Sequence, residues 1–430
     1  IDALRRGTVP ANGLDLLAVG LERFAEAVQN DLDTVAGGGA VFKAIRGEYG
    51  SGKTFFTRHL AETVSRQGWA AAEVQISETE TPLHRLETVY RRVTESLRTA
   101  SVPPSAFRAT LDAWLFTLED DALAANPGLE HAGPAAVTSA VDRLLEARLT
   151  AVTTKTPAFA QALRGYRSAV ATGDTASADA LAAWLGGQPH VAAAAKRGAG
   201  IRGDLDHFGA MAFLQGLLTV LRDAGHPGLL LVLDEVETLQ RVRGDVRDKA
   251  LNALRQLIDE IDTGRYPGLY LVITGTPAFY EGPSGVPRVP PLAQRLHTDF
   301  TTDARFDNPR AVQTRLPGFD RSSLVQLGTK VRNLYADGSQ DGGRVHSTVD
   351  DPYLGELADA VAGTLGGKVG IAPRVYLKKL VADVLDRVDQ FPGFNPRQHY
   401  ALTVADSELT DVERNAARPA RSVDDIELNL

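Results

Sequence analysis

The chain has 430 residues, enough for two or three domains of about 150 residues each, and its 43% hydrophobic and 23% charged residues are ordinary for a globular protein. Its 46 basic and 54 acidic residues give a net charge of −8, which argues against a generally basic nucleic-acid-binding protein but leaves room for a local basic patch. The absence of cysteine excludes a disulfide scaffold, a cysteine-ligated metal site and thiol catalysis and fits a cytoplasmic protein, and neither a membrane span nor a signal peptide is indicated.

The N-terminal hundred residues predict the opening of an α/β unit. A helix is expected over 14–36, ended by three glycines, because its apolar residues recur at helical spacing. Residues 40–68 then predict a strand, a glycine loop and a helix. A short strand at 69–77 and a helix over roughly 82–98 follow. This order is typical of a domain with a parallel sheet.

Residues 101–206 have a different character. They are rich in alanine and leucine, with proline and glycine between the apolar runs, and VDRLLEARL (141–149) and ADALAAWL (178–185) show helical spacing. Basic and acidic residues are nearly balanced, so this stretch is not a basic arm. We therefore predict a helical insertion within the α/β domain.

The α/β pattern resumes after the insertion, with buried strands at 228–237 and 268–277, each preceded by a helix that ends at a glycine. Residues 320–390 predict helices with a glycine-rich interruption at 338–343. The tail at 391–430 is polar, and we expect much of it to be loosely ordered. The predicted division is a core at 1–100 and 207–310, an insertion at 101–206, a lid at 311–390 and the tail at 391–430.

A glycine loop matches the pattern G-x-x-x-x-G-K-[ST] in full: Gly47, Glu48, Tyr49, Gly50, Ser51, Gly52, Lys53 and Thr54. Glycines let the backbone N–H groups of such a loop surround a phosphate, and the helix that follows adds its positive end. Lys53 would contact the β- and γ-phosphates, and the Thr54 hydroxyl would bind Mg²⁺. A chance match among 40 glycines is the alternative, but the strand before the loop and the helix after it favour a nucleotide site.

A buried strand, Leu229–Leu233, ends in two carboxylates, Asp234 and Glu235. Burying unpaired charge is costly, so these side chains belong at the carboxyl end of the strand, where α/β sheets bind ligands. Asp234 would hold Mg²⁺ through water, and Glu235 would activate the attacking water as general base. Two solvated acids are the alternative. Glu237 could either support these two carboxylates from a second layer of the site or simply be an acid in the first turn of a helix, and the sequence favours neither.

The strand at 269–276 ends with two hydroxyl residues, Thr274 and Thr276, which project to the same side because side chains alternate along a strand. Either could reach the γ-phosphate or the attacking water, or simply cap the strand end.

Two arginines stand where phosphate charge could be contacted. Arg295 could act on the γ-phosphate of a neighbouring subunit, and Arg374, at the start of a late helix, could act within its own chain. Either could instead be an ordinary surface arginine. The basic residues of 241–249 are interleaved with acids, which favours a solvated helix face over a nucleic-acid or partner contact. The nine histidines do not suggest a metal site.

With these motifs in this order, the chain resembles AAA+ ATPases of the origin-recognition/Cdc6-like or STAND-like branch: Walker A, Walker B, a sensor-1 strand, an arginine-bearing segment and a helical lid. More narrowly it resembles the BrxD family, the ATP-binding proteins of type 2 BREX bacteriophage-defence systems. The segments that carry this resemblance are RGEYGSGKTFFTRHLAETV, VQISETETPLH, LLLVLDEVETLQR and LYLVITGTPAFYEG.

This resemblance implies a three-layer α/β/α P-loop NTPase core with a parallel sheet, and ATP and Mg²⁺ as cofactors. It implies sensor-1 and sensor-2 roles for the threonines and for Arg374, and an arginine-finger role for Arg295. It also implies that the protein associates with a helicase or other defence proteins, or forms a homo-oligomer. Direct DNA binding stays possible. We expect an ATP hydrolase that remodels or loads a DNA-associated partner. An assembly scaffold that binds ATP with little turnover is the alternative, and a small-molecule phosphotransferase is disfavoured by the predicted lid.

Overall fold

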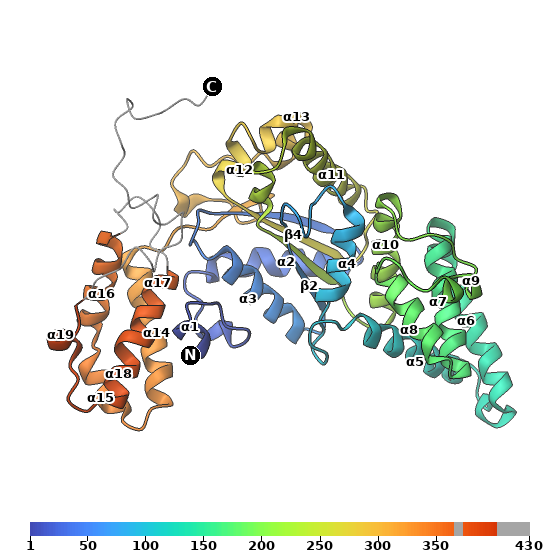
Figure 1. Cartoon of the computed structure of the whole chain (residues 1–430), viewed down its shortest axis with the longest axis horizontal. Coiled ribbons are helices and arrows are strands. Elements are labelled where there is room, and N and C mark those ends of the chain that lie inside the picture. Colours follow the sequence, from blue (N-terminus) through green and yellow to red (C-terminus); the bar gives the residue numbers. More distant parts are fainter. Residues whose placement is uncertain (365–372, 402–430) are drawn as a thin grey trace. The chain divides into compact units, whose positions relative to one another are not determined.

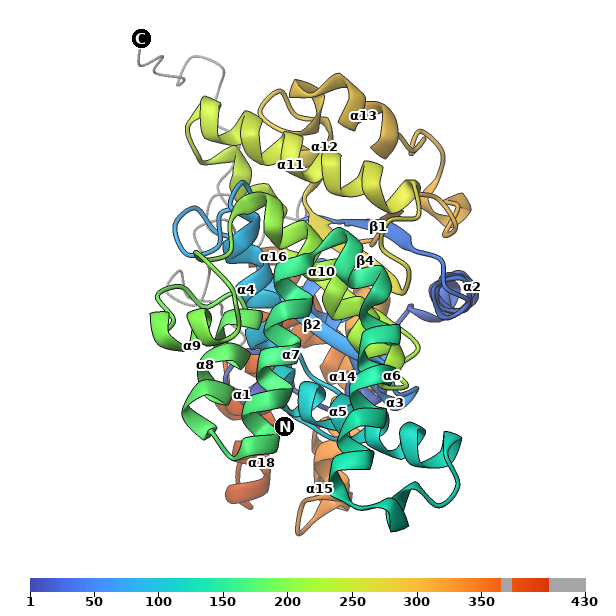
Figure 2. The same cartoon turned by 90° about the vertical axis from the view of Figure 1, so that its right-hand side faces the viewer.

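The computed structural model describes residues 1–364 and 373–401. Its strands form one sheet in the order β2-β3-β4-β1-β5. Strands β2 and β4 are labelled in Figure 1, and β1, β2 and β4 in Figure 2. Their bounds are β1 (Val41–Arg46), β2 (Ala70–Gln75), β3 (Leu229–Asp234), β4 (Leu269–Gly275) and β5 (Gln313–Arg315). Strand β3 pairs in parallel with both β2 and β4. The α/β class and the parallel sheet expected from the sequence are thus confirmed.

The chain divides into two compact units. Unit 1 comprises residues 1–26, 45–62 and those from 298 onward, and unit 2 comprises residues 27–44 and 63–297. Three elements have residues in both units: β1, α2 (Ala25–Ala36) and α3 (Lys53–Arg66).

The helices that belong wholly to unit 2 are α4 (Leu86–Ser96), α5 (Phe107–Ala125), η3 (Leu129–Ala132), α6 (Pro134–Lys155), α7 (Pro157–Thr172), α8 (Thr175–Leu185), α9 (Ala193–Gly198), α10 (His207–Asp223), η4 (Val236–Gln240), α11 (Gly244–Asp262), α12 (Pro277–Glu281), η5 (Val286–Arg288) and α13 (Pro290–Leu296).

Helices cover both faces of the sheet in unit 2. Every residue of β3 and β4 is buried, which is why these strands read as continuous apolar runs. Leu231 packs with α4 and α10 on one face. Tyr270 is paired in register with Leu230, one residue before Leu231, and so points to the opposite face. There its hydroxyl donates a 3.1 Å hydrogen bond to Asp31 of α2. The strands therefore form the middle layer between helices.

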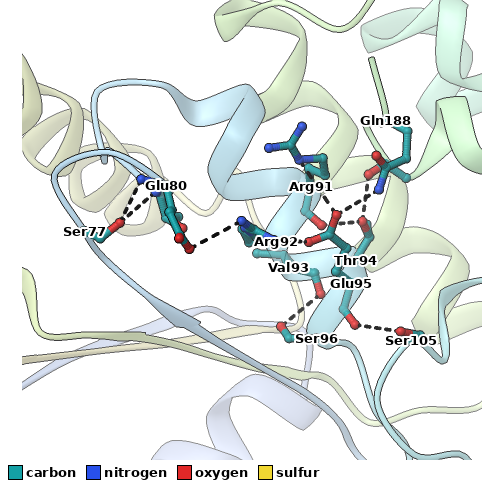
Figure 3. Close-up of polar contacts among 12 residues, drawn as sticks. Ser77, Glu80, Arg91, Arg92, Val93, Thr94, Glu95, Ser96, Ser105 and Gln188 are labelled. Carbon is teal, nitrogen blue, oxygen red and sulfur yellow. Dashed lines mark hydrogen bonds and ion pairs between the residues drawn. The ribbon is translucent and has the colours of Figure 1, made fainter. Parts of the chain in front are cut away.

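Helices α5 to α9 fill most of the predicted insertion and lie side by side in Figure 2. Polar contacts shown in Figure 3 join this segment to α4. The Thr94 hydroxyl donates to the carbonyl of Gly186 at 2.7 Å, and the Gln188 amide donates to the Glu95 carboxylate at 2.8 Å. The Ser105 hydroxyl donates to the carbonyl of Glu95 at 3.2 Å. The start of the helical segment and the turn after α8 are thus both attached to α4.

An aromatic cluster reinforces this attachment. Phe213 of α10 is 2% exposed, and its ring centroid lies 5.8, 5.0 and 5.2 Å from those of Tyr90, Phe159 and Trp184, all in edge-on geometry. These three rings come from α4, α7 and α8, so one side chain connects three helices. Edge-on aromatic pairs add to the stabilisation that burial provides.

We therefore expect Phe213→Ala to lower the free energy of unfolding by about 3–5 kcal/mol, because it leaves a cavity among three rings. Phe208→Ala on the same helix is the matched control, since Phe208 is 80% exposed, and it should change stability by no more than about 0.5 kcal/mol. Urea unfolding followed by tryptophan fluorescence measures the difference, because all three tryptophans lie in unit 2. Equal unfolding midpoints for the two variants would contradict the stabilising role assigned to Phe213.

Unit 1 is built mainly of helices. Besides elements shared with unit 2 it contains α1 (Asp2–Arg5), η1 (Leu14–Leu16), η2 (Glu22–Phe24), η6 (Ala304–Phe306), β5, α14 (Arg321–Asp337), α15 (Gly342–Thr348), α16 (Asp351–Thr364), α17 (Pro373–Lys378), the π-helix η7 (Lys379–Leu385), α18 (Asp386–Gln390) and α19 (Pro396–His399). Helices were predicted over 320–390, and the described part of that range contains them. Of the polar tail, residues 402–430 lie outside the described residues.

The N-terminal segment is part of the core of unit 1. Leu4 and Leu17 join the hydrophobic cluster of α14 to α18, and Arg5 forms an ion pair with Asp386 at 2.6 Å. The predicted continuous helix over 14–36 is wrong in its first half. Short 3₁₀ turns occupy that half, since Gly20 adopts φ 72°, in the left-handed region that an α-helix cannot include. The α-helix begins only at Ala25.

Within the described residues, none of the helices has both the length and the apolar character needed to cross a membrane.

Candidate functional site

The glycine loop of unit 1 has a backbone that calls for glycine at several positions. It runs from the end of β1 to the start of α3 at Lys53. Gly50 and Gly52 have φ values of 78° and 90°, which side chains rarely tolerate. Gly47 has no room for a side chain, because a Cβ there would overlap the Ser51 hydroxyl. The tight turn and the helix start that follows it suit a phosphate group, which backbone N–H groups and the helix end would hold.

Lys53 places its ammonium group against this loop. Its side chain is almost buried, and Nζ donates hydrogen bonds of 2.8 Å to the carbonyl of Gly47 and 3.2 Å to that of Glu48. The same nitrogen lies 5.3 Å from the centre of the Tyr49 ring. Lys53 therefore holds positive charge next to the loop backbone.

The carboxyl ends of β3 and β4 in unit 2 bring three predicted residues together. Asp234, at the end of β3, is 6% exposed, and Thr274 on β4 is fully buried. The Thr274 hydroxyl donates to Asp234 Oδ1 and accepts a 3.0 Å hydrogen bond from the backbone N–H of Glu235. That N–H also lies 3.1 Å from Asp234 Oδ1. The hydroxyl of Thr274 thus fixes both the buried carboxylate and the backbone of the residue after it.

Glu235 has an unusual backbone for a glutamate. Its φ and ψ of 61° and 42° lie in the left-handed region, which costs a non-glycine residue about 1–3 kcal/mol. Strain of this kind persists where surrounding contacts impose it, and it clusters at functional sites. Here the Glu235 N–H donates hydrogen bonds to Asp234 Oδ1 and to the Thr274 hydroxyl, and these contacts fix the backbone immediately after the buried strand β3.

Gln75 is a residue of this site that the sequence did not indicate. It ends β2, where its backbone is paired in register with Asp234, and its side-chain amide donates a 2.9 Å hydrogen bond to Glu235 Oε2. The contact restrains one oxygen of the proposed general base. The sequence offers little signal for it, because Gln75 is only one of the polar residues within the strand predicted at 69–77.

The other predicted residues lie as follows. Thr276 is buried and immediately precedes α12, but its side chain does not cap that helix. Glu237 is buried in the first turn of η4. Arg295 of α13 forms an ion pair with Asp259 of its own chain and is 42% exposed. Arg374 lies in the first turn of α17, beside Gly7 of the N-terminal segment.

Two of the basic residues at 241–249 contact partners in unit 2. The Arg247 guanidinium donates to the backbone carbonyls of Leu239, Gln240 and Val242, so it stabilises the end of η4. Arg243 is exposed and paired with Asp245 at 3.0 Å. These contacts favour the solvated-face interpretation of this run.

No group of three or more histidine, aspartate or glutamate side chains suited to a metal ion occurs in the described ranges. Mg²⁺ is usually bound through one or two carboxylates together with the phosphates of a nucleotide, whereas a metal held by protein alone needs more protein ligands. One carboxylate and one threonine hydroxyl therefore suit Mg²⁺. Asp234 and Thr54 have this donor chemistry.

Comparison with known proteins agrees with the resemblance in the motifs. The model of the family described as BREX system ATP-binding protein BrxC/D matches residues 1–404, which is most of the 430-residue chain. No curated protein and no solved structure matches the chain. The family match covers the glycine loop, both buried strands and the helices of unit 1. The chain therefore belongs to the BrxC/BrxD family of BREX system ATP-binding proteins.

Proposed function

We propose that this protein is an Mg²⁺-dependent ATPase of a BREX-type bacteriophage-defence system. In this proposal ATP binding and hydrolysis remodel or load a DNA-associated partner, such as a helicase, in the cytoplasm. Family membership supports the ATP-binding role. The observation that supports hydrolysis is the strained Glu235, held next to the buried Asp234 at the carboxyl end of a parallel strand.

Each proposed role follows from the chemistry of a side chain. The backbone of residues 47–52 and the Lys53 ammonium would hold the phosphates, and Thr54 and Asp234 would hold Mg²⁺. Bound Mg²⁺ would neutralise phosphate charge that develops during transfer. Glu235 would accept a proton from the attacking water. Thr274 acts as a positioning residue, because its hydroxyl binds both Asp234 and the Glu235 backbone.

The roles of Thr276, Arg295 and Arg374 rest on the sequence pattern. For Arg295 to reach the γ-phosphate of a neighbouring subunit, its guanidinium must exchange Asp259 for that phosphate. Arginine suits such an exchange, since its planar fork binds carboxylate and phosphate alike.

Phosphate release by the purified full chain separates this proposal from a scaffold that binds ATP with little turnover. The hydrolase should release many phosphates per chain in Mg²⁺ and none above background when Mg²⁺ is chelated. A scaffold would bind ATP in Mg²⁺ and leave it intact. Release that persists at the same rate after chelation would contradict the proposed roles of Asp234 and Thr54.

A further inference from the structure

The helical segment 101–206 contains a groove of about 550 Å³ that the proposed ATPase chemistry does not use. Helices α5, α6, α7 and α8 line it. Its apolar lining includes Leu115, Phe116, Val137, Val141 and Val170.

Two of these apolar side chains are exposed. Phe116 on α5 is 67% exposed and Val170 near the end of α7 is 46% exposed. By contrast, Trp114, two residues before Phe116, is buried, and its indole donates to Asp223 of α10 at 2.6 Å. Helix α5 therefore packs through one face and presents Phe116 on another. A phenylalanine over an apolar groove is the kind of anchor that interfaces use.

The charged side chains of the groove and their ion-pair partners include more acids than bases. Two arginines line it, and each is paired with an acid outside the lining: Arg108 with Asp179, and Arg167 with Asp142. Two further carboxylates, Asp112 and Glu119, belong to the lining itself. They stand four residues before and three residues after Phe116, hence on the same face of α5.

Asp112 also accepts a hydrogen bond from Tyr166, and its closest approach to Arg108 is 3.9 Å. Burial lowers the pKa of the Arg167 guanidinium. The negative charge of Glu119 acts in the opposite direction and raises that pKa, but its effect is smaller.

Within the lining, two arginines and two carboxylates balance. The ion-pair partners Asp179 and Asp142 lie outside the lining and bring this set of charges to two arginines and four carboxylates, a net charge of −2. A partner that covers these charges gains by bringing positive charge.

We propose that this groove binds a basic amphipathic segment of another protein. Apolar side chains of that segment would pack against Phe116 and Val170, and lysine or arginine side chains would lie opposite Asp112 and Glu119. A helix in an apolar groove is a common mode of recognition. The contacts of Figure 3 and the rings around Phe213 attach the helices of this surface to α4 and α10 of unit 2. The proposal goes beyond the proposed function and does not depend on ATP hydrolysis.

A synthetic probe tests the groove without knowledge of the natural partner. The probe is a fluorescein-labelled leucine/lysine peptide of about 18 residues, roughly five helical turns, with leucines at helical spacing. A peptide with glutamate in place of lysine is its counterpart. Fluorescence polarisation with the full chain at physiological salt should show saturable binding of the lysine peptide and much weaker binding of the glutamate peptide.

Phe116→Ala should weaken binding of the lysine peptide at least tenfold, whereas Phe208→Ala, which removes an exposed ring outside the groove, should leave it unchanged. Replacing Asp112 and Glu119 together by lysine should reverse the preference between the two peptides. Phe116 is exposed, so the variant is expected to fold, and an unchanged thermal midpoint checks this.

Absence of saturable binding, equal binding of both peptides, or equal effects of the two phenylalanine variants would overturn the proposal. A dimer that the Phe116→Ala variant cannot form, seen as a mass difference in solution without peptide, would instead assign the groove to a second copy of this chain and would also overturn it. None of these outcomes depends on ATP turnover, so they are distinguishable from failure of the proposed ATPase.

Discussion

Replacing Glu235 by glutamine should reduce ATP turnover by about 10²- to 10⁴-fold, the usual contribution of a general base, and leave ATP affinity nearly unchanged. The amide has almost the size of the carboxylate but cannot accept the proton of the attacking water. The substitution leaves the backbone N–H of residue 235 in place, together with its hydrogen bonds to Asp234 and Thr274. Loss of turnover with retained binding would therefore report chemistry and not a collapsed site.

Glu80→Gln is a matched control for this variant. Glu80 lies in the loop after β2, is 79% exposed, and its contact with Arg92 is a distant 3.9 Å. The control should retain turnover, because an exposed ion pair of this kind contributes little. If Glu235→Gln hydrolyses ATP as fast as this control, Glu235 is not the base.

Lys53→Ala should weaken ATP binding by about 100-fold or more. Hydrogen bonds to charged groups contribute about 1.5–3 kcal/mol each, and contact with two phosphates would involve at least two of them. The ammonium lies next to the loop backbone, so its loss removes positive charge where the phosphates would bind. Titration with a fluorescent ATP analogue measures the change.

Lys53→Arg serves as the companion to the alanine variant. It keeps the positive charge, but its larger planar group does not fit a position made for a compact ammonium, so affinity should fall between those of the wild type and Lys53→Ala. A thermal melt should accompany both variants, because Lys53 donates to two loop carbonyls. Unchanged affinity in folded Lys53→Ala would exclude the glycine loop as the phosphate site.

The parts of this fold that follow from local rules could be predicted. Strands β3 and β4 are buried along their whole length, so they appear as unbroken apolar runs. The glycine loop could be recognised because its φ angles and its lack of space demand particular residues. Asp234 and Glu235 could be placed at a strand end because buried carboxylates need partners.

Features that depend on contacts between distant segments could not be predicted. Gln75 meets Glu235 only because β2 and β3 pair in one register, which no local pattern specifies. Strand β5 has three residues and no apolar periodicity. Arg295 has a partner, Asp259, on another helix, and its position in the sequence does not reveal that pairing.

The sequence also does not show which apolar residues of a helix are exposed to solvent. Phe116 and Trp114 are two apolar residues of one helix, and helical spacing alone does not show which of them is buried. The sequence therefore predicts helices over 101–206 without showing which of their faces are packed. The structure shows an exposed aromatic ring among carboxylates on one of these helices.

The most direct test of the central claim is the identity of the nucleotide bound to the protein after incubation with ATP and Mg²⁺. Wild type and Glu235→Gln would be incubated alike, separated rapidly from free nucleotide, and their bound nucleotide measured by chromatography. The account predicts mainly ADP on the wild type and intact ATP on the variant, with similar amounts of nucleotide on both. The same ratio of ADP to ATP on the two proteins, or no bound nucleotide on either, would contradict it.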